Sequence, residues 1–268
     1  MPPAALSPAA QAFDAIAADF DARFMPWLSV EAQRRAIRAA LVDAFPRGAR
    51  LIDIGGGTGE DALWLTGQGR EVLMTDASPA MVTIASAKAG GRFRATVAAA
   101  EHFGELADRL SVEPAFDGAY SVFAPLNCVD DLSSFAQGIA KLLLPGAPLM
   151  LVLFGARCPG EMLVETLRGR PGNALRRFRR GDVPARLGGR EFSVRYHRSR
   201  DLQRALQPWF RLQSRRGIGI FVPPSAAEPW ISSYPRFLKT LEWMDRIAAR
   251  PLAMLGDHIL YHFERTDA

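Results

Sequence analysis

The sequence has few of the residues from which cross-linked folds and metal centres are built. Its 268 residues include two cysteines, Cys128 and Cys158, and four histidines. Two distant cysteines provide neither a set of disulfides nor a metal-ligand spacing. With 49% hydrophobic residues, a chain of this length can bury a large core of its own. The sequence therefore predicts a fold without disulfides and without a metal site.

Long apolar runs are also missing. No run reaches the roughly 20 residues that a membrane-spanning helix needs. Residues 1–5 lack the basic start and the following apolar core that mark a signal peptide. We therefore expect a cytoplasmic protein.

The most informative stretch covers residues 51–61, Leu-Ile-Asp-Ile-Gly-Gly-Gly-Thr-Gly-Glu-Asp. Residues 50–54 are short and mostly apolar, with β-branched side chains at Ile52 and Ile54, which is typical of a strand buried in a parallel sheet. Glycines then let the backbone reverse sharply and come close to a ligand. A helix is predicted for residues 60–66. A strand, a glycine turn and a helix in this order indicate a site for a nucleotide-type ligand.

A second strand, predicted for residues 72–75, ends at Asp76. A carboxylate at this position can accept hydrogen bonds from both hydroxyls of a ribose. Two successive strand ends are thus expected to face one nucleoside.

The spacing of the glycines separates the common nucleotide sites. A dinucleotide fingerprint has glycines at the first, third and sixth positions. Here Gly55, Gly57 and Gly59 occupy the first, third and fifth positions, and Glu60 stands at the sixth. An acid at the helix start repels a pyrophosphate but tolerates a ligand with an amine and a sulfonium. The stretch resembles motif I of the class I methyltransferases that use S-adenosylmethionine.

The resemblance extends over residues 45–155. Residues 76–81 are similar to the family's second strand end and the helix after it. Residues 98–103 fall where the family often has Gly-Asp-Ala-Glu, although Ala99 replaces the Asp. Residues 116–154 are similar to the fourth strand, a helix, a Pro-Gly turn and the fifth strand. The resemblance implies an α/β fold with a Rossmann-like, seven-stranded, mostly parallel sheet and helices on both faces.

The start of the chain adds to this resemblance. Residues 13–21 resemble the Tyr-Asp-x-x-Ala-x-x-Tyr-Asp opening of many small-molecule methyltransferases, with Phe20 in place of the second tyrosine. An amphipathic helix that caps the sheet is the alternative interpretation. The family's motifs imply S-adenosylmethionine as the cofactor, bound by Phe20, Asp53, Gly55, Gly57, Gly59, Asp76, Ala77, Met81, Ala100, Glu101 and Phe123.

The order of predicted elements shows where the chain departs from the family. Residues 200–209 match the helix after the fifth strand, and residues 210–217 and 258–264 match the last two strands. Two extra segments remain, at about 156–199 and 219–256, and both leave carboxyl ends of strands, where such sheets bind ligands. We therefore expect a helical N-terminal lid at 1–45 and a methyltransferase domain at 46–268, in which these insertions cover the methyl-acceptor pocket.

Charge is unevenly distributed. Residues 1–150 contain 12 Lys and Arg against 17 Asp and Glu, whereas residues 151–268 contain 21 against 11. Three interpretations stay open: a solvated surface, a site for an acidic small molecule or an anionic membrane surface, and a nucleic-acid site. Nucleic acid ranks last because stacking aromatics are not interleaved. Most of the excess lies in Arg168, Arg170, Arg176, Arg177, Arg179, Arg180, Arg186, Arg190, Arg195, Arg198, Arg200 and Arg204.

The second insertion is rich in aromatic residues. Phe237, Leu241 and Met244 recur at helical spacing, which favours a helix docked on the domain. The alternative is an apolar acceptor pocket lined by three aromatic residues before the periodic part, Phe221, Trp230 and Tyr234.

No catalytic residue is identified. Methyl transfer is an in-line displacement in which orientation alone can supply roughly 7–11 kcal/mol of the barrier. A general base is needed only for a protonated acceptor, and Asn127 is a further candidate to meet the acceptor. The candidate bases are His102, His197, Asp130, Asp131 and Glu228.

The sequence thus predicts methyl transfer to an oxygen, nitrogen or carbon atom of a small apolar or aromatic metabolite. A catalytically silent methyltransferase-like binding protein is the first alternative. A nicotinamide-dependent oxidoreductase is the second, and Glu60 disfavours it. The oligomeric state stays open.

Overall fold

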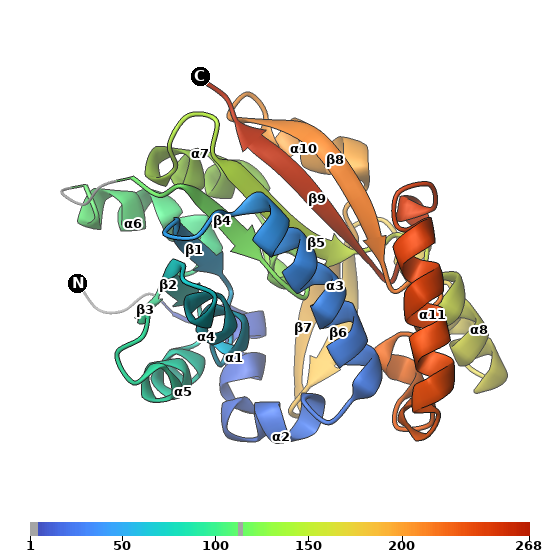
Figure 1. Ribbon diagram of the computed structural model, residues 1–268. Helices are drawn as coiled ribbons and strands as arrows, with labels where there is room; N and C mark the ends of the chain where they lie inside the picture. Colours follow the sequence, from blue (N-terminus) through green and yellow to red (C-terminus); the bar gives the residue numbers. More distant parts are fainter. Residues whose placement is uncertain (1–4, 112–114) are drawn as a thin grey trace.

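Seven strands form one central sheet in the computed structural model, which describes residues 5–111 and 115–268 (Figure 1). The strand order is β3-β2-β1-β4-β5-β9-β8, and β9 runs antiparallel to both of its neighbours. The other pairings are parallel, so the predicted seven-stranded, mostly parallel sheet is confirmed. The strands are β1 (Arg50–Ile54), β2 (Glu71–Asp76), β3 (Arg94–Val97), β4 (Gly118–Ser121), β5 (Pro148–Phe154), β8 (Phe210–Ile218) and β9 (His258–Arg265).

The central strands are buried on both faces. In β1, Leu51 packs into one core cluster and Ile52 and Ile54 into the other. Because successive side chains of a strand point to opposite faces, a strand covered on both sides needs a continuous apolar run. Asp53 is the polar residue that interrupts this run, and it too is buried.

Helices cover both faces, as predicted. One face carries α3 (Leu28–Ala44), α4 (Glu60–Gly67) and α5 (Pro79–Ala89). The other carries α6 (Phe103–Arg109), α7 (Leu132–Leu142) and α10 (Ser199–Leu206). Within residues 5–111 and 115–268, no helix has both the length and the apolar character that crossing a membrane requires.

The remaining elements lie at the edge where the parallel strands end. The N-terminal segment forms α1 (Pro8–Asp14), η1 (Ala17–Asp19) and α2 (Phe20–Phe24). The first insertion contains the helices α8 (Pro159–Leu167), α9 (Pro171–Ala174) and η4 (Arg176–Phe178). It also contains a β-hairpin of β6 (Asp182–Leu187) and β7 (Arg190–Arg195), which was not predicted from the sequence. The second contains η5 (Ser225–Ala227), η6 (Ile231–Ser233), α11 (Pro235–Ala248) and η7 (Ala253–Leu255). Short turns η2 (Ala100–His102) and η3 (Pro125–Cys128) complete the chain.

A buried ionic network holds the first insertion against the start of β9. The Arg177 guanidinium donates through Nη2 to Glu161 Oε2 at 2.5 Å and to Asp257 Oδ1 at 2.6 Å. Burial by itself lowers the pKa of Arg177, but the two carboxylates outweigh it and raise that pKa. Burial likewise raises the pKa of Asp257, whereas His258 and Arg177 hold it well below its usual range. The network is therefore fully charged at neutral pH.

Replacing Arg177 with methionine is expected to lower the free energy of unfolding by about 3–5 kcal/mol, because Glu161 and Asp257 would remain buried without their cation. Urea denaturation at pH 7 measures this loss. The control is Arg179→Met, which changes an exposed neighbour and should shift stability by less than about 0.5 kcal/mol. Equal effects of the two substitutions would contradict the structural role of Arg177.

Candidate functional site

A cavity of about 510 Å³ lies at the carboxyl ends of β1, β2, β4 and β5. The sheet order reverses between β1 and β4, and such a switch point is where open α/β sheets bind ligands. Side chains after each of these strands form its floor, and the N-terminal segment and the β6–β7 hairpin line the other sides. Ten of the eleven residues assigned to the cofactor by resemblance line this cavity; Gly59 does not.

The glycine turn fixes the position of the strand ends. Gly55 has φ +69° and Gly57 has φ +58°, a region that residues with a Cβ rarely adopt. In this conformation the Gly57 N–H donates to Asp76 Oδ2 at 2.9 Å. Gly59 caps α4 instead, and a Cβ there would lie 2.7 Å from the Phe93 ring. Gly59 thus shapes the turn from behind the cavity.

Asp76 is held by backbone on both of its oxygens. Oδ1 accepts from the Ser78 N–H at 2.8 Å, and Oδ2 accepts from Gly57. Burial raises the pKa of Asp76 even though these hydrogen bonds lower it. Each carboxylate oxygen has a second lone pair, so the group can still accept from two ligand hydroxyls.

Two charged side chains at the cavity have unsatisfied buried atoms. Asp53 Oδ2 and Arg34 Nε have no hydrogen-bond partner among the described residues. Burial and the nearby negative charge of Asp61 raise the pKa of Asp53 well above its usual value. The Arg34 guanidinium lies over the Phe123 ring, 5.1 Å from its centroid. Buried polar atoms are normally paired, so this arrangement fits a ligand that carries both an amine and a carboxylate.

Arg34 is a site residue that the sequence analysis missed. It lies on α3, 19 positions before Asp53 in the sequence, and no motif marks it. The helix brings Arg34 and Arg38 to Asp61, with Arg34 Nε 3.6 Å and Arg38 Nε 2.7 Å from the carboxylate. Only the packing of α3 beside α4 creates this position.

The far end of the cavity is mainly apolar. Ala77, Met81, Ala98 and Ala100 form an apolar wall there, with Glu101 beside them. Position 99, where the family often has an acid, does not line the cavity. Small side chains and one methionine suit the face of a flat base, and Glu101 can accept hydrogen bonds from its edge.

The N-terminal segment is attached to the site by two acids. Asp14 accepts from the Ser78 hydroxyl at 2.7 Å and from the Ala80 N–H at 2.9 Å. Asp21 accepts from Lys88 Nζ and from the Thr58 hydroxyl, both at 2.6 Å. These acids follow Phe13 and Phe20, whose rings line the cavity. From the sequence we predicted a role for Phe20 but none for Asp14 and Asp21 in attaching this segment.

The cavity continues towards the β6–β7 hairpin. Its wall there is mainly apolar, with Phe192 and Val194 from β7 and Phe154 from β5. The Phe13 ring on α1 packs 6.0 Å from the Phe192 ring, so lid and hairpin meet over the cavity. Arg186 is the exposed cation on this side.

The aromatic residues of the second insertion do not form the pocket that one interpretation predicted. Phe221, Trp230 and Tyr234 are 37%, 59% and 51% exposed, and none lines the cavity. The docked-helix interpretation holds, but α11 packs through Leu238 and Leu241, since Phe237 is exposed. The cause is the position of the insertion, which packs on the N-terminal end of α3, where Leu28 and Ala32 lie.

None of the candidate bases lines the cavity. Glu228 accepts from the Ser29 N–H and the Ser232 hydroxyl, and Asp131 caps α7. Asn127 accepts from the Phe154 N–H at 3.0 Å and donates to the Arg195 carbonyl. His102 and Asp130 are exposed, and His197 lines a different cleft. The structure thus assigns none of these six residues to the cavity.

Comparison with known proteins points to one family. A family model described as a methyltransferase domain matches residues 27–209. A search of curated protein sequences finds no match. The fold is similar to that of a putative S-adenosylmethionine dependent methyltransferase from Listeria monocytogenes, with 14% identity, a TM-score of 0.57, and coverage of 88% of this chain and 98% of that one.

Two further solved structures have the same fold. The DhpI-SAM-HEP complex has 17% identity, a TM-score of 0.57 and coverage of 96% of both chains. A structure described for the conversion of a disulfide bond into a thioacetal group during echinomycin biosynthesis has 23% identity and a TM-score of 0.52, and covers 85% of this chain and 80% of that one.

Replacing Asp76 with alanine is expected to weaken S-adenosylmethionine binding by about 1.5–3 kcal/mol, or roughly 10- to 150-fold, through loss of charge-assisted hydrogen bonds. Isothermal titration calorimetry measures the affinity. Asp76→Asn keeps the shape but turns an NH2 donor toward the N–H of either Ser78 or Gly57, so it should also weaken binding. An unchanged affinity of Asp76→Ala would contradict the assignment.

Replacing Asp21 with asparagine is expected to speed hydrogen exchange in α2 at pH 7, because the Lys88 ion pair is lost. Burial raises the pKa of Asp21, but the bonds from Lys88 and Thr58 outweigh it and lower that pKa. The attachment is therefore present above pH 4 and weakens as pH falls through the lowered pKa, so wild type and variant should converge in acid. Asp19→Asn, at an exposed neighbour, is the control; exchange as fast in this control would refute the role of Asp21.

Proposed function

The chain belongs to the methyltransferase domain family and uses S-adenosylmethionine, and we propose that it methylates an oxygen, nitrogen or carbon atom of a small, apolar-bodied metabolite. One observation carries this proposal. The cavity that contains the glycine turn and Asp76 continues without a break to the apolar wall of the β6–β7 hairpin. A cofactor and a small acceptor can therefore share one continuous cavity.

We propose the following roles for the cofactor end. Asp76 accepts hydrogen bonds from the ribose hydroxyls, and Met81 and Ala98 contact the base. Asp53 and Arg34 hold the amine and the carboxylate of the methionine part, and the amine satisfies the buried Asp53 Oδ2. When bound, the cofactor supplies a methyl group activated by its sulfonium. The eleven residues assigned by resemblance keep their proposed roles, with Gly59 acting through the turn.

The acceptor end selects by shape and apolar contact. Phe13, Phe154, Phe192 and Val194 surround the space beyond the glycine turn, so an apolar body is favoured there. Arg186 has no carboxylate partner among the described residues, so it can meet an acidic group on the acceptor. Of the segment 1–45 proposed as a lid, α1 and α2 cover the cavity, whereas α3 packs on the sheet; residues 1–4 lie outside the described residues.

The protein contributes orientation more than proton transfer. Of the cavity's titratable groups, Tyr196 has a pKa raised by burial, and burial raises the pKa of Cys128 to about 12. Both therefore stay protonated at neutral pH, and the Tyr196 hydroxyl can donate a hydrogen bond that fixes the acceptor. Holding the nucleophile in line with the methyl group supplies the main rate enhancement.

The test is methyl transfer from isotopically labelled S-adenosylmethionine into a native metabolite extract, with the labelled product identified by mass spectrometry. Phe192→Ala should lower kcat/KM for that acceptor about tenfold or more while the cofactor affinity stays unchanged, because the ring lies at the acceptor end. Trp230→Ala, which removes an exposed aromatic outside the cavity, is the control.

Two results would contradict the proposal. The cofactor at about 100 times its Kd should stabilise the fold by roughly 2.7 kcal/mol. That stabilisation without any labelled product from any extract would identify a catalytically silent binding protein. A loss of activity in Trp230→Ala equal to that in Phe192→Ala would place the acceptor elsewhere.

A further inference from the structure

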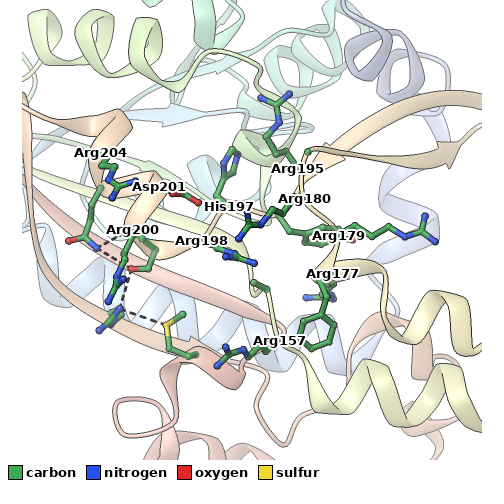
Figure 2. Close-up of a pocket in the computed structure, with 18 residues that line it drawn as sticks. Arg157, Arg177, Arg179, Arg180, Arg195, His197, Arg198, Arg200, Asp201 and Arg204 are labelled. Carbon is green, nitrogen blue, oxygen red and sulfur yellow. Dashed lines mark hydrogen bonds and ion pairs between the residues drawn. The ribbon is translucent and has the colours of Figure 1, made fainter.

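A second cleft, of about 980 Å³, lies beside the methyl-transfer cavity and is strongly basic (Figure 2). Nine arginines and one acid, Asp201, line it. They come from the connection between β5 and α8, from η4 and the residues after it, from the end of β7 through α10, and, with Arg215, from β8. Figure 2 shows Arg157 at one edge of the cleft, Arg195 at the opposite edge, and Arg198 between them. Of all lining residues, Tyr196 is the one shared with the first cavity.

Some of these arginines have structural partners. Arg177 belongs to the buried network with Glu161 and Asp257, and Arg195 pairs with Asp182 at 2.6 Å. Others do not. Across residues 5–111 and 115–268, no carboxylate pairs with Arg157, Arg179, Arg180, Arg198 or Arg200.

Unpaired guanidinium groups gathered in a concave cleft repel one another. Like charges near a protein surface interact over several ångströms, and a concave wall concentrates their field. The start of α10 adds to it, because Arg198 at the N-cap makes no side-chain capping bond that would offset the partial positive charge of the helix N-terminus. This concentration of positive charge favours binding of an anion with several negative groups.

We propose that this cleft binds a small ligand that carries two or more phosphate groups. The planar fork of a guanidinium matches the geometry of phosphate oxygens and remains charged at every physiological pH. One phosphate cannot contact five separate arginines around a cleft of this volume, whereas a chain of phosphates can. The proposal adds a second site to the enzyme, distinct from the cofactor and acceptor positions.

The shape of the cleft favours a small molecule over a macromolecular surface. A bilayer presents a flat array of headgroups, and a concave site cannot bring its arginines to that plane. Single-stranded nucleic acid binds through successive bases stacked on aromatic side chains. Phe178 and Tyr196 line this cleft, and Tyr196 is half-buried. These two rings do not form a row on which successive bases could stack.

The experiment is titration calorimetry with sodium triphosphate and with sodium phosphate at matched ionic strength. The cleft variant combines Arg157→Gln, Arg180→Gln and Arg198→Gln, which lie in three different segments of the cleft wall. The control variant combines Arg236→Gln, Lys239→Gln and Arg246→Gln, which removes the same charge from the exposed face of α11. Binding of S-adenosylmethionine by all three proteins verifies that each is folded.

Triphosphate should bind wild type at least about tenfold more tightly than phosphate. The cleft variant should lose triphosphate affinity by about 30-fold or more, and the control should change by less than about threefold. Absence of triphosphate binding, or an equal loss in both variants, would overturn the proposal. So would binding of a single-stranded RNA oligonucleotide or of phosphatidylglycerol vesicles that triphosphate does not displace, because the cleft would then serve a macromolecule or a membrane.

Discussion

The hydrogen bond from the Gly57 N–H to Asp76 ties the glycine turn after β1 to the end of β2, and the cavity proposed for the cofactor is arranged around it. The N-terminal segment attaches close to both partners of this bond. Asp21 accepts from Thr58, next to Gly57, and Asp14 accepts from Ser78, two residues after Asp76. The bond requires a turn that takes positive φ at Gly57. Cofactor floor and lid therefore depend on one local backbone geometry.

Arginine has three different surroundings in the first insertion, and we propose a different function for each. Arg177 is buried between two carboxylates and holds the insertion to the sheet. Arg186 faces the acceptor end of the cavity. Arg180 and Arg198 lack carboxylate partners and line a separate cleft. A guanidinium that stays charged in every setting makes this division possible.

The site also shows how little chemistry the protein itself must supply. The six candidate base or acceptor-contact residues named from the sequence lie elsewhere, and the cavity is lined by apolar side chains and by groups that stay protonated at its acceptor end. Under the proposed function, such a site acts by selecting the acceptor and orienting it. We therefore propose that Phe192 and the β6–β7 hairpin, which line the cavity, select the acceptor.

The mostly parallel sheet was implied by the family resemblance. The sequence by itself determined the glycine turn and the position of Asp76 at a strand end, because strand burial and turn conformation depend on neighbouring residues. It could not determine that Arg34 reaches Asp53's surroundings, that Gly59 faces away from the cavity, or that Trp230 is exposed. Those outcomes depend on how α3 and the insertions pack against the sheet. Packing between segments far apart in the chain leaves no local pattern, so only the tertiary structure decided which arginines pair and which remain free.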